Sequence, residues 1–110
     1  MTIYHAHIYF SLDRTDEAKK LRELSVEKWS DKVLGISKLI SRPIGPHPVP
    51  MFEIDFPETV LQDMKQWLET HRGDLSVLIH RNQEPELVEH TTHAIWLGQR
   101  LKLDLSVLDQ

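Results

Sequence analysis

The sequence contains no cysteine, which excludes disulfide bonds and thiolate metal sites and favours a reducing compartment such as the cytoplasm. No apolar run approaches the roughly 20 residues of a membrane span. The first residues also lack the basic and apolar regions of a signal peptide. The net charge is −4 without a basic stripe, so nucleic acid is not an expected partner. We therefore expect a cytoplasmic protein that uses neither nucleic acid nor a membrane.

What the chain does have is ordinary globular composition and many histidines. Its 110 residues are 40% hydrophobic and 27% charged, and no linker or repeat divides them, so we expect a single domain over residues 1–110. Imidazole both binds metals and titrates near neutral pH. The seven histidines are His5, His7, His47, His71, His80, His90 and His93.

Residues 2–10 predict a β-strand because they are rich in isoleucine and aromatic residues and contain neither glycine nor proline. Side chains alternate across a strand, so His5, His7 and Tyr9 share one face. The other face is apolar and should be buried. It carries Tyr4, Ala6, Ile8 and Phe10.

The remaining pattern predicts a helix, two strands, a second helix and a further strand. We expect these elements over residues 15–31, 33–41, 51–56, 57–72 and 75–80. The order β-α-β-β-α-β is typical of a ferredoxin-like α+β fold, in which both helices cover one face of an antiparallel sheet. A C-terminal extension follows, with a short apolar element at 94–98 and alternating apolar residues over 101–107.

In a ferredoxin-like sheet the first strand lies between the third and the fourth. Strand parity then places His5, His7, Glu53 and His80 on the face away from the helices. His47 arrives beside them on a stiff loop, because the surrounding residues 42–50 include four prolines.

A lone histidine on a strand is more often structural than a ligand, but grouped imidazoles suit zinc, iron, copper and nickel. Three histidines would leave coordination positions free, as in iron(II) sites that bind a substrate and dioxygen together. A closed zinc site would use four ligands and do no chemistry. The residues alone leave these alternatives open.

Five segments resemble the DOPA 4,5-dioxygenase family of small ring-cleaving enzymes, in the order found in that family. The most specific are the Gly-Pro-His-Pro block and the Trp-Leu-Gly ending. The segments are residues 5–10, 45–53, 75–80, 90–91 and 94–98. The resemblance implies a ferredoxin-like fold, a non-haem metal and extradiol cleavage of a catechol with dioxygen.

One segment and one single residue depart from the family pattern. After the histidine of the fourth strand the family usually reads Pro-Asn-Thr-Gly-Asp, whereas residues 81–85 read Arg-Asn-Gln-Glu-Pro. The acid before the later histidine is usually aspartate, and here it is Glu89. The loop over residues 81–85 is therefore a candidate wall of the substrate pocket.

Together with the resemblance, parity makes His7, His47 and His80 the candidate metal ligands, with Glu53 in reserve. We expect the non-haem metal that the resemblance implies to be iron(II), although zinc or another divalent metal would suit the same side chains. The remaining site candidates supply proton transfer and the aromatic pocket. They are His5 and His90 as base and acid, and Tyr9 and Trp96 as residues that line the pocket for an aromatic diol.

Two other functions fit the same pattern: a non-catalytic dimeric metal-binding module, and a cofactor-free monooxygenase in which histidine acts only as a base. We also expect a homodimer. The face away from the helices should expose Ile3, Met51 and Leu78, and the apolar residues of 101–107 need burial too.

Overall fold

The computed structural model describes residues 1–108, and its five strands form one antiparallel sheet in the order β2-β3-β1-β4-β5. The strands are β1 (Ile3–Tyr9), β2 (Gly35–Ile36), β3 (Met51–Pro57), β4 (Val77–Arg81) and β5 (Ile95–Leu97). The α-helices are α1 (Thr15–Trp29), α2 (Leu61–His71) and α3 (Glu86–His90). This confirms the expected ferredoxin-like α+β fold, with α3 and β5 in its C-terminal extension.

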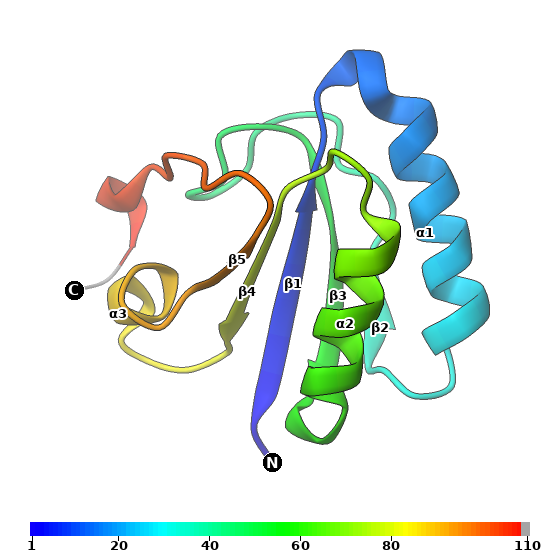
Figure 1. Cartoon of the computed structure of the whole chain (residues 1–110). Helices are drawn as coiled ribbons and strands as arrows, with labels where there is room; N and C mark the ends of the chain where they lie inside the picture. Colours follow the sequence, from blue (N-terminus) through cyan, green and yellow to red (C-terminus); the bar gives the residue numbers. More distant parts are fainter. Residues whose placement is uncertain (109–110) are drawn as a thin grey trace.

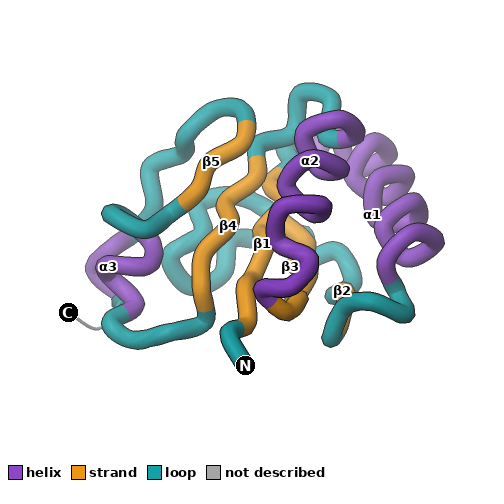
Figure 2. The backbone as a smooth tube through the Cα atoms, turned by 60° about the horizontal axis from the view of Figure 1, so that its bottom comes forward, coloured by secondary structure: helices purple, strands orange, loops and turns teal. Residues whose placement is uncertain are grey.

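Helices α1 and α2 lie side by side over one face of the sheet (Figures 1 and 2). The main core lies between this helical layer and the strands. The predicted apolar faces of the three long strands all belong to it, and alternate side chains of β1, β3 and β4 are buried there. Parity was therefore read correctly, and it leaves the opposite face of the sheet to the histidines.

The opposite face is covered by the chain itself. Met51 and Leu78 are buried in a second, smaller cluster together with Tyr9. The side chains packed on this cluster come from the loop before β3 and from the C-terminal segment; they are Ile40, Val49, Ala94, Trp96, Leu101 and Leu103. The exposed patch that favoured a dimer is thus filled from within one chain, and the homodimer stays a prediction.

The second strand is much shorter than the predicted range 33–41. Regular pairing stops at Ile36, opposite Ile54, and a single bridge follows between Ile40 and Met51. Ile36 and Ile40 are four residues apart, whereas their partners on β3, Ile54 and Met51, are three residues apart. One extra residue is therefore inserted, and the ladder breaks as at a β-bulge. The hydroxyl of Ser37 accepts the Glu53 backbone N–H at the break.

Two further boundaries differ from the prediction. Helix α2 begins at Leu61 rather than Pro57, because a 3-10 turn over Glu58–Val60 precedes it. The alternating residues 101–107 form no strand: they run as coil into the 3-10 turn Leu105–Val107. Within residues 1–108, no helix is long and apolar enough to cross a membrane.

Candidate metal centre

Strand pairing brings the predicted site residues of three strands together. His5 of β1 is paired with His80 of β4 on one side and with Asp55 of β3 on the other. His7, two residues along β1, is paired with Glu53. Because all these side chains have the same parity, they lie on the face opposite α1 and α2.

Two of the imidazoles contact each other directly: the Nε2 atoms of His7 and His80 are 2.9 Å apart. His90, at the end of α3, completes a group of three imidazoles with ligand atoms within 4.8 Å of one another. All three side chains are buried. The group includes two of the three ligands predicted from the sequence, with His90 in the place predicted for His47.

Hydrogen bonds at the outer ring nitrogens turn two of these imidazoles toward the centre. Nδ1 of His80 lies 2.9 Å from the backbone carbonyl of Arg81, and Nδ1 of His90 lies 2.8 Å from that of Glu86. A carbonyl can only accept, so each Nδ1 carries the proton and donates it. In the neutral ring the Nε2 lone pair is then free for a metal, which is how second-shell carbonyls orient histidine ligands.

The electrostatic environment keeps the imidazoles of His7 and His80 neutral. Burial, together with the nearby His47 and His80, holds the pKa of His7 well below its ordinary value. Burial and the neighbouring His90 lower the pKa of His80 to about 4. Neutral imidazole is the form that coordinates a metal, so these rings need not lose a proton near pH 7.

The separation of the nitrogens also suits one shared ion. Two nitrogens that each lie about 2.1 Å from a metal, at a right angle, are about 3 Å apart. The 2.9 Å between His7 and His80 matches that geometry. Without a shared proton or cation, two lone pairs at this distance would repel each other. The donor set therefore fits a divalent transition metal such as zinc or iron, without selecting between them.

His47 stands beside this group and makes a separate contact. Its ring centroid is 4.0 Å from that of His7, and its Nδ1 lies 2.7 Å from the hydroxyl of Tyr9. Burial and the nearby His90 lower the pKa of His47 to about 4, so this imidazole is neutral as well. Burial also raises the pKa of the Tyr9 hydroxyl, which therefore keeps its proton. The structure thus joins His47 to Tyr9, a contact that the sequence did not predict.

His5 lies in a half-buried acidic corner of the cluster. Its Nδ1 is 2.8 Å from a Glu53 carboxylate oxygen and 2.6 Å from Oδ1 of Asp55. Burial opposes a charge on His5, but the hydrogen bonds with Asp55 and Glu53 outweigh it and raise its pKa to about 10. His5 is therefore an imidazolium at neutral pH, which suits a proton donor rather than a base. Glu53 belongs to this corner, and burial raises the pKa of its carboxyl.

A buried carboxylate that was not among the predicted site residues joins the two elements carrying His80 and His90. Glu89 is 1% exposed and accepts hydrogen bonds from the guanidinium of Arg81, at 3.0 and 2.8 Å. His93 lies 2.8 Å from the same carboxylate. The hydrogen bonds to Arg81 outweigh burial and lower the pKa of Glu89 to about 2. Because each partner is next to a cluster histidine in sequence, this ion pair fixes β4 against α3.

A cavity of about 390 Å³ opens over the cluster, with His7, His47, His80 and His90 in its wall. Trp96 is not in that wall: it lines a neighbouring cavity that His90 also lines. Tyr9 lines neither cavity: its hydroxyl lies 2.7 Å from Nδ1 of His47, and its ring centroid is 6.1 Å from that of Trp96. Both aromatic residues predicted to line a pocket thus lie beside the cluster.

The fold and this buried group of imidazoles define a ferredoxin-like protein with a candidate metal centre. The chain belongs to the Dopa 4,5-dioxygenase family, whose family model matches residues 4–107. The resemblance noted in the sequence is therefore confirmed over nearly the whole chain.

Known proteins agree with this membership. The chain is 31% identical over 111 residues to DOPA 4,5-dioxygenase of Amanita muscaria, and 38% identical over 114 residues to an uncharacterized 21.2 kDa protein of Botryotinia fuckeliana. Each match covers 96% of this chain but only 49% and 62%, respectively, of those relatives, so the chain spans about half to three-fifths of their length.

A solved structure supports the same class. The crystal structure of a candidate dioxygenase from Nostoc punctiforme superimposes with a TM-score of 0.89 at 28% identity, covering 97% of this chain and 90% of that one. The family model, these relatives and the shared fold thus agree on the family to which the chain belongs.

Proposed function

We propose that this protein opens the ring of a catechol by the extradiol route, with dioxygen and a non-haem iron(II) ion. The observation that carries the proposal is the group of three buried imidazoles, His7, His80 and His90, in a chain of this family. Three histidine ligands leave positions open, whereas a closed structural site would use them all.

His7, His80 and His90 would hold the ion through Nε2. The alternative third ligand is His47, as predicted from the sequence, with His90 then free to move protons. When bound, iron(II) supplies adjacent open positions for the diol and dioxygen and a path for electrons between them. The three side chains are buried, and the cavity of about 390 Å³ over the cluster leaves room for the diol.

The chain's own residues supply the proton transfers. With His90 as a ligand, the neutral His47 is the base that takes a proton from the catechol, and the hydrogen bond with Tyr9 holds its ring in place. His5 is charged and returns a proton from the opposite side of the cluster, held by Glu53 and Asp55. Hydrogen bonds with the same two carboxylates stabilise the protonated form of His5.

The overall reaction balances with dioxygen as the only co-substrate. One ring carbon–carbon bond beside the diol breaks, and each of the two carbons gains one atom of dioxygen. The products of that cleavage are an aldehyde and a carboxylic acid within one opened chain. The ring is oxidised while dioxygen is reduced, so no external reductant takes part.

Reconstitution tests this function. The purified chain is loaded with iron(II) without air, and oxygen uptake and the yellow ring-fission product are measured with a panel of catechols. We expect oxygen uptake that depends on both iron and catechol. Tight metal binding without any turnover would instead favour the dimeric metal-binding module, and metal-independent oxygen uptake would favour the cofactor-free monooxygenase.

A further inference from the structure

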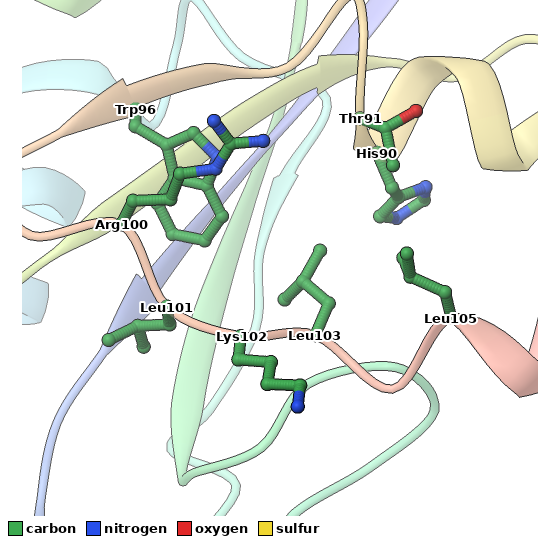
Figure 3. A pocket seen from close by; sticks show the side chains of 8 residues that line it. All are labelled: His90, Thr91, Trp96, Arg100, Leu101, Lys102, Leu103 and Leu105. Atoms are coloured by element: carbon green, nitrogen blue, oxygen red, sulfur yellow. The ribbon is translucent and has the colours of Figure 1, made fainter.

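A second cavity, of about 400 Å³, lies next to the histidine cluster and shares His90 with it. Figure 3 shows Trp96 on one side of this space, His90 and Leu105 on the other, and Leu103 projecting between them. The volume is within the usual range for small-molecule sites, roughly 300–1,000 Å³, and the walls are mostly apolar. A substituted aromatic ring would therefore fit between Trp96 and the leucines, with one end at His90.

The charged residues of this cavity all have the same sign. Arg100 and Lys102 line it, and no aspartate or glutamate of residues 1–108 does so. Neither cation has an ion-pair partner in this part of the chain. The cavity over the histidine cluster carries acidic residues instead, because Glu53 and Glu86 line it. An anionic group on a ligand is thus favoured on the Arg100 side and disfavoured on the other.

We propose that Arg100 and Lys102 make this protein select catechols whose side chain is negatively charged and carries no positive charge. This inference rests on the proposed function, since it places the diol at the histidine cluster and the side chain in the second cavity. A carboxylate at that end meets a guanidinium, which binds it through two parallel N–H groups. An ammonium group meets two cations and no carboxylate, so it weakens binding.

The proposal ranks four catechols that differ only in the side chain. Dihydrocaffeate carries a carboxylate, DOPA adds an ammonium group to that same carbon chain, ethylcatechol is neutral and dopamine is cationic. We expect affinity to fall in that order from dihydrocaffeate, with DOPA and ethylcatechol close together and dopamine last. Because the two cations are exposed at the rim, the step from ethylcatechol to dihydrocaffeate is roughly fivefold to tenfold.

The test measures binding separately from turnover. Dissociation constants are obtained by calorimetry with zinc-loaded protein, and kcat/KM is obtained with iron-loaded protein. Arg100→Gln, Lys102→Gln and the double variant are compared with Lys20→Gln on α1, which lies in the helical layer on the far side of the sheet. In the double variant the affinity ratio of dihydrocaffeate to ethylcatechol should approach one, whereas Lys20→Gln should keep the wild-type ratio.

Each outcome separates this inference from the proposed function. The selection by Arg100 and Lys102 is overturned if dopamine or DOPA binds more tightly than dihydrocaffeate. It is also overturned if the double variant keeps the wild-type affinity ratio of dihydrocaffeate to ethylcatechol. If all four catechols are opened with equal kcat/KM, this inference fails while the dioxygenase function stands. If none is opened but the binding order holds, the function fails and the anion preference stands. If none binds, both fail.

Discussion

The Nε2 atoms of His7 and His80 lie 2.9 Å apart, although 73 residues separate them in the chain. Pairing between β1 and β4 creates this contact, and His90 at the end of α3 joins it. Two neutral, buried imidazoles at this distance form the centre of the proposed metal site. The predictions below follow from how the surrounding residues hold them.

Replacing each ligand should remove the metal. His7→Ala, His80→Ala and His90→Ala each delete one of the three grouped nitrogens, so iron per chain should fall well below one. His47→Ala should keep most of its iron and lose turnover, because His47 contacts Tyr9 instead. Iron per chain is measured by plasma mass spectrometry after reconstitution.

A distant histidine supplies the matched control for these variants. His71→Ala alters an imidazole at the end of α2, where it stacks on Trp67, and it should keep both metal and activity. If His47→Ala lost the iron and His90→Ala retained it, the ligand set predicted from the sequence would be the correct one.

His5 should affect turnover but not metal content. His5→Gln removes the imidazolium that Glu53 and Asp55 hold, while leaving all three grouped nitrogens in place. We expect iron per chain to stay near the wild-type value and kcat to fall roughly 10²-fold, the usual size of a general acid's contribution. A variant with unchanged kcat would show that His5 has no part in the proton transfers.

The metal-free protein should lose stability in acid. The pKa values of His47 and His80 are lowered to about 4 in the folded chain, and burial holds that of His7 well below its ordinary value, whereas unfolded histidine titrates near 6.5. Below pH 6.5 the unfolded state therefore binds more protons than the folded state, and the free energy of unfolding falls down to about pH 4. His47 and His80 each account for at most on the order of 3 kcal/mol.

Urea unfolding of the metal-free protein across this pH range measures the effect. His5 does not contribute to it, because with a pKa raised to about 10 it is protonated in both states below pH 6.5. Its own contribution is present at low pH and is lost as pH rises toward 10. Stability that stayed flat between pH 6.5 and 4 would contradict the neutral, buried state of His7, His47 and His80.

Glu89 should matter both to the fold and to the metal. Glu89→Gln leaves the guanidinium of Arg81 without its anion and weakens the link between β4 and α3. We expect Tm to fall by roughly 5–10 °C and iron affinity to fall as His80 and His90 lose their alignment. Glu89→Asp should restore part of that iron affinity.

An exposed ion pair serves as the comparison for Glu89. Glu69 and Arg72 form a similar acid–arginine contact on the surface of the helical layer. Glu69→Gln should change Tm by no more than about 2 °C and leave iron affinity unchanged. Equal effects of the two variants would mean that Glu89 does not position the cluster.

The sequence predicted what depends on local alternation. The strand order followed from the β-α-β-β-α-β pattern, and the shared face of His5, His7 and His80 followed from parity. The core followed from the apolar side chains of the same strands. Local alternation could not predict His90 as the third member of the imidazole group, because its position depends on how α3 returns to β4. Burial of Glu89 by Arg81 and the contact between Tyr9 and His47 are set by tertiary packing in the same way.

Errors in the prediction also have physical causes. The second strand was expected over residues 33–41, and an inserted residue before Ile40 interrupts its pairing. The apolar residues of 101–107 alternate as in a strand, yet Leu101 and Leu103 cover Met51 and Leu78 as coil. Apolar residues at alternate positions indicate that one side of a segment is buried. They do not by themselves distinguish a strand from an extended segment that covers the sheet.

The most direct test of the proposed chemistry follows the atoms of dioxygen. Iron-loaded protein is mixed with dihydrocaffeate under dioxygen labelled in both atoms, and the product is reduced at once with borohydride to trap the aldehyde. Mass spectrometry should find two labelled oxygen atoms in one ring-opened product. A product with a single labelled atom and an intact ring would contradict extradiol cleavage and indicate a monooxygenase instead.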